Sequence, residues 1–238
     1  LDLSKAHHLV LSYDYLLRKN LRFKTEAYYQ HLFHVPVEKG VASSFSMLNE
    51  IDGAIWRKLE NTGTGRNYGL EFTGEQFLTH GFYWLASLSI FRSEYRGSDE
   101  VWRSTRFDSR YAGTLTGGKE WNWNRRGKNR TFGVNLKLIS TGGAMDTPVN
   151  LEASKTQGET IYVEEQAFSQ QLPSYFRLDT GFRLKRNYRH LTTTLSLDIQ
   201  NTTNQQNLGG KYFDLKTETV KTWYQSSMIP ILAYRLDF

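Results

Sequence analysis

Residues 230–238 alternate between apolar and polar side chains up to the last residue, and this pattern constrains the fold most. Successive side chains of a β-strand point to opposite faces. One face of this segment is therefore expected to be apolar and the other polar. Such a strand suits a membrane barrel with lipid outside and water inside, or the edge of a soluble sandwich. The apolar face comprises Leu232, Tyr234, Leu236 and Phe238, and the polar face Ala233, Arg235 and Asp237.

The same alternation recurs along the chain and predicts about nine strands. The clearest case is residues 190–201, where Leu195 and Leu197 alternate with Thr194 and Ser196. No stretch has a convincing helical period of 3.6 residues, so we predict an all-β, antiparallel fold. The other strands are predicted at 5–17, 20–33, 68–73, 81–96, 106–122, 131–138, 175–184 and 219–238.

The connections between the predicted strands alternate in length. Short turns on one side and long loops on the other are typical of outer-membrane β-barrels, and loops this long are uncommon in compact soluble domains. We expect the chain to start and end on the short-turn side, with its C-terminus in the periplasm. Short turns are predicted at 18–20, 79–81, 124–128 and 186–189, and long loops at 34–64, 97–108, 141–173 and 204–218.

The strand number and the absence of targeting segments indicate a partial barrel. About nine strands would leave two sheet edges exposed to lipid, so we interpret residues 1–238 as the C-terminal part of a larger barrel. No stretch approaches 18 apolar residues, which argues against a transmembrane helix. The chain has no Cys, so no disulfide framework is expected. It starts at Leu1 without an initiating Met or a signal peptide, so we read it as a mature piece or a fragment.

Residues 121–130 interleave tryptophans with bases, and the formal charge of the chain is +6. Alone, this segment could indicate a site for single-stranded nucleic acid. It lies between two alternating strands, however, where interfacial aromatics followed by a basic turn are expected at a membrane surface. We therefore predict no nucleic-acid partner.

No other motif indicates chemistry. Gly63 to Gly69 is glycine-rich but leads into a strand, unlike a dinucleotide-binding fingerprint. His7 and His8 are adjacent, so on a strand they would face opposite sides and could not chelate a metal together. No Ser/His/Asp arrangement is readable. We predict no catalytic residue, no metal site and no cofactor, and hence no enzyme.

Four segments recur in order along the chain: Asn61–Gly63 with Tyr68–Glu71, Tyr175–Asp179, Leu197–Asn204 and Pro230–Phe238. Together they resemble the C-terminal half of a TonB-dependent outer-membrane receptor of the kind abundant in Bacteroidetes. The resemblance implies a barrel of roughly 22 strands around an N-terminal plug. It also implies import of a scarce ligand, such as an iron chelate, a corrinoid or a glycan, across the outer membrane of a Gram-negative bacterium.

The resemblance further implies partners and a terminal signal. The partners would be outer-membrane lipid, the plug domain, the TonB complex, the barrel-assembly machinery and a small-molecule or glycan ligand. Tyr234, Leu236 and Phe238 would form the signal that assembly factors read. The chain itself carries no plug and no energy-coupling box, so those functions fall on no residue of it. The charged residues expected to line the barrel interior are Glu71, Arg177, Asp179, Arg183, Asp198 and Arg235.

Ligand contacts are predicted only from position in the long loops. The candidates are Trp56 and Arg57 in one loop and Trp102 and Arg103 in the next. Two alternative functions stay open. One is a complete small barrel that passes solutes passively, and the other is a soluble secreted β-sandwich that binds carbohydrate through Tyr and Trp.

Overall fold

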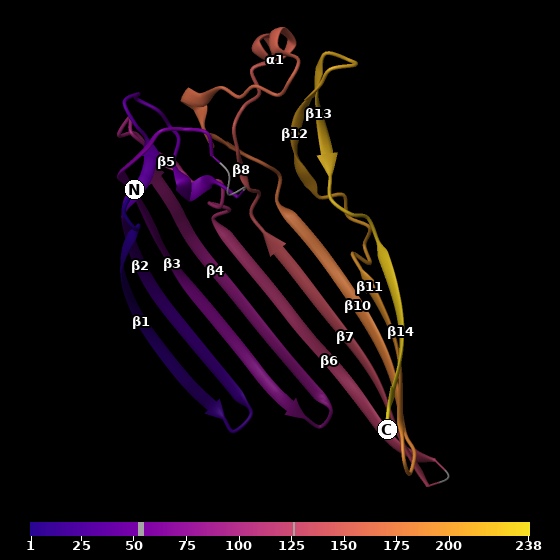
Figure 1. The fold of residues 1–238 in the computed structure, drawn as a ribbon. Helices are drawn as coiled ribbons and strands as arrows, with labels where there is room; N and C mark the ends of the chain where they lie inside the picture. The colour runs from indigo at the N-terminus through magenta and orange to yellow at the C-terminus, as the bar shows by residue number, and fades with distance from the viewer. Residues whose placement is uncertain (52–54, 126) are drawn as a thin grey trace.

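The computed structural model spans the whole chain and describes residues 1–51, 55–125 and 127–238. Most of these residues form one large antiparallel sheet of ten strands, nine of which follow one another as neighbours in chain order (Figure 1). The predicted all-β, antiparallel fold is confirmed. The strands are β1 (Lys5–Arg18), β2 (Leu21–Glu38), β3 (Leu59–Thr79), β4 (Phe82–Arg96), β5 (Trp102–Ser104), β6 (Tyr111–Arg125), β7 (Lys128–Thr141), β10 (Tyr175–Asn187), β11 (Thr192–Gln200) and β14 (Ile229–Asp237).

The predicted single strand at 219–238 is wrong, because this stretch holds two strands in different sheets. β13 (Thr219–Tyr224) pairs with β12 (Leu208–Asp214) in a separate hairpin, and β14 then joins the main sheet. The predicted loop 204–218 thus contains β12. Gly209 and Gly210 interrupt the alternation, so the sequence pattern does not indicate that strand. Both glycines lie under the ring of Trp223, which would overlap a side chain at Gly209.

The tight turns lie at one end of the sheet and the long loops at the other (Figure 1). In the turn between β3 and β4, His80 and Gly81 both have positive φ, 51° and 75°. This is the type I′ geometry that matches the twist of paired strands. The C-terminus lies at the short-turn end as predicted, but β1 begins at the loop end. The expected start on the short-turn side is wrong, because an odd number of antiparallel strands places the two ends on opposite sides.

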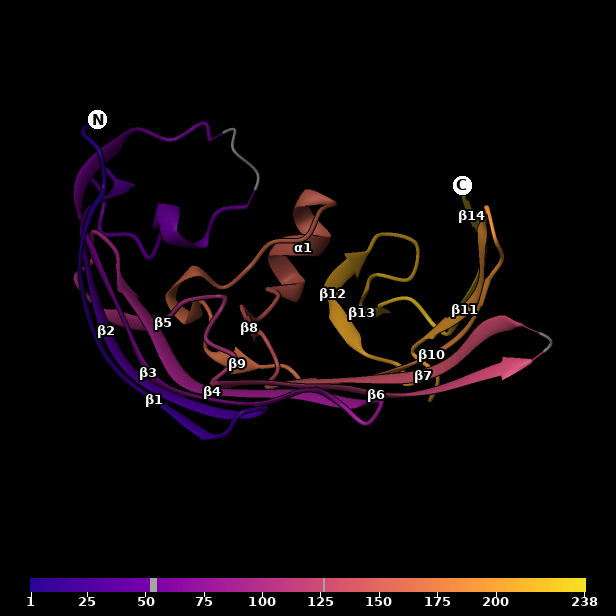
Figure 2. The same ribbon diagram turned by 90° about the horizontal axis from the view of Figure 1, so that it is seen from below.

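The sheet is strongly curved, and the loop elements lie on its concave side (Figure 2). Among the described residues, no helix is long and apolar enough to cross a membrane. The small elements here are the helix α1 (Leu151–Gln157), the 3-10 turns η1 (Met47–Asn49) and η2 (Glu164–Gln166), and the strands β8 (Met145–Asp146) and β9 (Gln170–Gln171), together with β12 and β13.

The strand register gives the sheet one apolar and one polar face. Leu184, Leu195 and Tyr234 are direct neighbours across β10, β11 and β14, whereas Arg183, Ser196 and Ala233 form the adjacent row. The polar row faces the concave side, which also holds the loops. The loop residue Leu48, for example, lies against Gly65, which shares its face of β3 with Asn67 and Glu71. The apolar face is therefore the convex one.

In the described ranges, the hydrophobic core lies at the loop end. The apolar side chains of the convex face are exposed instead; Leu9 and Leu232, for example, are each 72% exposed. An apolar surface of this extent is rarely left in water by soluble proteins. The buried apolar residues of the described chain are Val35, Val37, Tyr95, Met145, Ala167 and Phe213.

Candidate ligand-binding site

A cavity of about 300 Å³ opens among the loops on the concave side of the sheet. Its walls come from three loops: residues 39–58 after β2, 105–110 after β5 and 142–174 after β7. The volume is at the lower end of the range for small-molecule sites. The lining residues are Ser44, Phe45, Ser46, Asn49, Glu50, Arg57, Arg106, Met145, Asp146, Thr147, Tyr162, Glu164, Ala167 and Phe168.

Asn49 is the polar anchor of the cavity. It ends η1, a 3-10 turn capped by the hydroxyl of Ser46, which accepts a hydrogen bond from the backbone N–H of Leu48. Asn49 is only 4% exposed. Its Oδ1 accepts from the backbone N–H of Arg106 at 3.0 Å, and its carbonyl accepts from Arg106 Nη1 at 2.9 Å.

The amide nitrogen of Asn49 is left without a partner. Its Nδ2 atom is buried and has no hydrogen-bond acceptor within the described part of the chain. Leaving a buried donor unpaired costs about 1–3 kcal/mol.

Arg57 joins two of the loops and contributes to the same wall. Its Nη1 donates to Glu38 Oε2 at 2.6 Å and its Nη2 to Glu164 Oε1 at 3.4 Å. The guanidinium carbon lies 4.8 Å from the ring centre of Phe45, a cation–π geometry. Burial lowers the pKa of Arg57, but the two carboxylates outweigh burial and leave the pKa raised. The guanidinium is therefore permanently charged.

Aromatic rings form the other part of the wall. Phe168 packs edge-on against the fully buried Tyr95 of β4, with 6.1 Å between ring centres. Burial raises the pKa of Tyr162, and the nearby Asp146 carboxylate raises that pKa further. The phenol therefore stays protonated at neutral pH and can donate a hydrogen bond.

The cavity thus combines apolar ring surfaces with donors and acceptors of hydrogen bonds. Asn49, Arg106 and Tyr162 supply donors, and Asp146 and Glu164 supply carboxylate oxygens. This mixture can hold a ligand that both donates and accepts. Within the described ranges, no group of three or more His, Cys, Asp or Glu side chains is placed to hold a metal ion.

Of the four predicted ligand contacts, only Arg57 lies on this cavity. Trp56 is 98% exposed. Trp102 lies between Arg66 and Arg96, whose guanidinium carbons are 4.4 and 5.6 Å from its ring centre. Along β3 and β4, the residues on either side of these arginines face inward, so the arginines themselves point outward. Trp102, which contacts both, therefore lies on the outer side of the sheet.

Arg103 is held by protein contacts. It forms an ion pair with Asp99 at 2.7 Å, and both side chains are largely buried.

The sequence prediction missed Asn49, Arg106 and Tyr162. They lie in three loops that are distant in the chain, and no local pattern marks them.

The predicted terminal signal lies on the convex face of the last strand. Tyr234, Leu236 and Phe238 are 63%, 49% and 100% exposed. β14 pairs only with β11, so its other edge is unpaired in the described sheet. Recognition of these residues by assembly factors stays a prediction.

The predicted inner charges share the concave face. Arg183 and Arg235 line one inward hollow with Thr194, and Glu71 lines another with Tyr28. Arg177 and Asp179 form a two-pronged ion pair at 2.7 and 2.8 Å at the loop end of β10.

Comparisons of the chain with protein-family models, curated proteins and solved structures gave no match.

Proposed function

We propose that this chain is the C-terminal part of the barrel of a TonB-dependent outer-membrane receptor that imports a scarce ligand. One observation carries the proposal. Across nine neighbouring strands, the register sets an apolar convex face against a polar concave face. Lipid outside and water inside would satisfy both faces of a single sheet.

Three further features support a barrel wall. Tight turns and long loops are separated at opposite ends of the sheet, as in outer-membrane barrels. The outer edges of β1 and β14 are unpaired, so further strands would be required to close the sheet. In the part of the chain that the structure describes, no second sheet packs on the convex face, which disfavours a soluble sandwich.

The loop cavity supports a receptor role more than a passive channel. It lies on the concave side, on the path that a solute would follow through the barrel, and its wall carries the donor side chains of Arg106 and Tyr162. An iron chelate, a corrinoid and a glycan each carry the acceptor oxygens or nitrogens that such donors would bind. We propose binding and transport, with no chemical conversion of the ligand. Energy coupling would come from the plug domain and the TonB complex.

Membrane location is tested first. The full gene product would be expressed in a Gram-negative host, and its membranes would be separated by density. We expect the protein in the outer-membrane fraction, with a gel mobility that changes on heating, because folded barrels resist detergent. A monodisperse protein that remains soluble without detergent would instead support the carbohydrate-binding sandwich.

Transport is tested with a panel of a ferric chelate, a corrinoid and an oligosaccharide. We expect uptake of one class to require TonB, and Asn49→Ala to weaken its binding more than Trp56→Ala, because Asn49 lines the cavity and Trp56 does not. Uptake that continues equally in cells lacking TonB would favour the passive channel. Equal effects of the two substitutions would exclude the cavity as the ligand site.

A further inference from the structure

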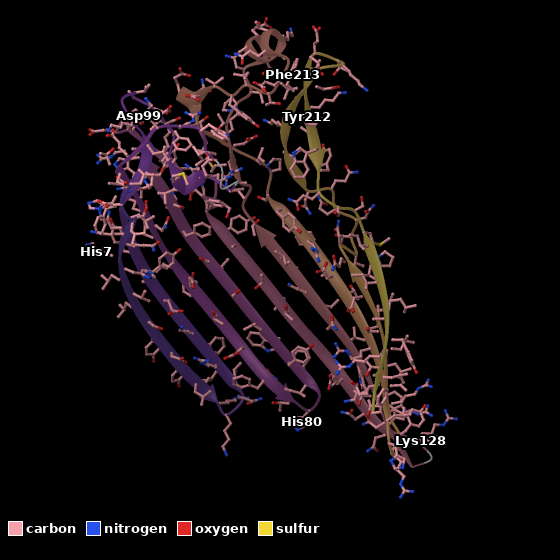
Figure 3. The ribbon with its side chains drawn as sticks, in the orientation of Figure 1. His7, His80, Asp99, Lys128, Tyr212 and Phe213 are labelled. Carbon is pink, nitrogen blue, oxygen red and sulfur yellow. The ribbon has the colours of Figure 1, made fainter. Side chains whose placement is uncertain are left out.

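We propose that the convex face at the short-turn end binds the phosphate of an anionic phospholipid headgroup. The inference rests on the proposed membrane location but concerns a different site, at the opposite end of the sheet from the ligand cavity. Figure 3 shows Lys128 at this end, among many nitrogen-bearing side chains. The site, called the basic patch below, comprises Arg125, Lys128, Arg130 and Arg186, flanked by Trp121 and Trp123.

The register places two arginines directly opposite each other. Arg130 of β7 is the neighbour of Arg186 on β10 and of Trp123 on β6. Like charges directly opposite in a sheet repel and destabilise it. An anion between the two guanidinium groups would remove this repulsion.

Strand alternation points the basic patch outward. On β10, Arg183 and Lys185 line inward hollows with Thr194 and Arg235, so Arg186 lies on the other face. On β7, Thr131 lines an inward hollow with Glu120, which directs Arg130 to the convex face. The apolar neighbours of the patch on that face are Phe132 and Leu184, a register pair in the next row.

The sequence around the four bases lacks acidic residues. Residues 121–131 and 183–193 contain no Asp or Glu. Among the described residues, none of the four bases takes part in an ion pair, unlike Arg22 or Arg177 elsewhere in the sheet. Phosphate oxygens accept the forked hydrogen bonds that guanidinium groups offer.

The surroundings favour a lipid headgroup as the source of the phosphate. Trp121 stacks on Phe132 with 5.8 Å between ring centres, and Trp121 and Trp123 are 46% and 40% exposed. Lys128 Nζ lies 4.8 Å from the ring centre of Tyr188. Tryptophan and tyrosine collect at the headgroup level of membranes, between the apolar band and the water. Bases in that layer attract anionic lipids.

The test compares outward and inward charges on the same strands. The full gene product would be reconstituted in phosphatidylcholine nanodiscs with increasing phosphatidylglycerol, and retained phosphatidylglycerol would be measured by native mass spectrometry. Arg130→Gln and Arg186→Gln should each raise the apparent Kd for phosphatidylglycerol about fivefold. The matched inward substitutions Arg183→Gln and Lys185→Gln should leave it unchanged. Arg186→Lys, which keeps the charge, should retain most of the binding.

Four other results would each contradict the proposal, and each points to a different explanation. Equal losses from outward and inward substitutions would indicate a general charge effect. Retention of phosphatidylcholine as strong as that of phosphatidylglycerol would exclude recognition of an anion. Displacement of the lipid by inorganic phosphate at low concentration would indicate a site for free anions. Failure of the unsubstituted protein to enter any lipid disc would overturn the proposed membrane function as well.

Discussion

Asn207 uses both atoms of its side-chain amide to bind the backbone of Phe176. Its Oδ1 accepts from the Phe176 N–H at 2.9 Å, and its Nδ2 donates to the Phe176 carbonyl at 2.8 Å. Asn207 is only 5% exposed, and it thereby supplies the hydrogen bonds that a neighbouring strand would give to the start of β10. Asn207 also contacts the residues just before β14, because its backbone carbonyl accepts a hydrogen bond from the Gln225 N–H at 2.8 Å. One amide thus ties β10 to the β12–β13 hairpin.

Replacing this residue tests the importance of that link. Asn207→Ala would remove both hydrogen bonds and leave two Phe176 backbone groups unpaired, so we expect a loss of about 1–3 kcal/mol in the free energy of unfolding. The neighbouring Gln206→Ala, at an exposed position, should change it by less than about 0.5 kcal/mol. Urea-induced unfolding of the refolded gene product measures both. A loss no larger than that of Gln206→Ala would refute the structural role of Asn207.

The β12–β13 hairpin contains a pH-dependent ion pair. Lys221 beside Asp214, helped by the hydroxyl of Thr217 at 2.8 Å, lowers the pKa of the Asp214 carboxyl to about 2. An unfolded chain gives this carboxyl a pKa of about 3.9. The folded value is lower, so the pair stabilises the hairpin fully above about pH 4 and loses this effect as the pH falls through about 2.

Carboxyl-carbon NMR titration measures this pKa directly. Lys221→Met should move the midpoint of Asp214 upward, toward the value in an unfolded chain. Lys216→Met also removes a positive charge from the hairpin, but only the backbone N–H of Lys216 contacts Asp214, at 3.2 Å. It should leave the midpoint close to 2. Equal shifts in the two variants would show that net charge, rather than the Lys221 contact, sets the pKa.

The base of the long loop after β7 depends on glycine. A side chain at Gly143 would overlap the carbonyl oxygen of Leu172 and approach that of Pro173 at 2.8 Å. Gly143→Ala should therefore destabilise the protein by about 1–3 kcal/mol and disturb the cavity that this loop lines. Gly133→Ala is the control, because its nearest atom would be Glu120 Cγ at 3.7 Å. Thermal unfolding of the two variants should separate them, and equal melting temperatures would contradict the close packing.

The main sheet could be predicted from the sequence because its signal is local. In a strand such as β11, apolar and polar residues alternate with a period of two. This pattern can be recognised in the sequence without knowing which strands lie beside it. The β12–β13 hairpin was missed because Gly209 and Gly210 interrupt the alternation. Their meaning depends on Trp223, which reaches them only across the hairpin.

The candidate site could not be predicted in the same way. Asn49 and Arg106 meet through two hydrogen bonds although 57 positions separate them. Loop residues carry no periodic signal, and only Arg57 was found from loop position. The motif residues Arg177 and Asp179 were assigned to the barrel interior, and Asp179 in addition accepts from the backbone N–H of Asn201 at 2.8 Å. This motif therefore braces the turn that follows β11.

The two faces of β11 give the sharpest test of the membrane proposal. Leu195 lies on the convex face between Leu184 and Tyr234, and it is 43% exposed. If lipid covers that face, Leu195→Arg should cost about 2–4 kcal/mol near the membrane midplane. Thr194→Arg, one residue away, would point to the wet concave face. Its register neighbours there are the like charges of Lys185 and Arg235, which cost about 0.2–1 kcal/mol, and the Asp237 carboxylate lines the same hollow.

The free energy of unfolding in lipid vesicles would be measured for both variants. We expect the arginine at position 195 to reduce the folded fraction, seen as heat-modifiable gel mobility, far more than the arginine at position 194. Equal damage at the two positions would refute the assignment of the convex face to lipid, and greater damage at Thr194 would place the apolar environment on the concave side.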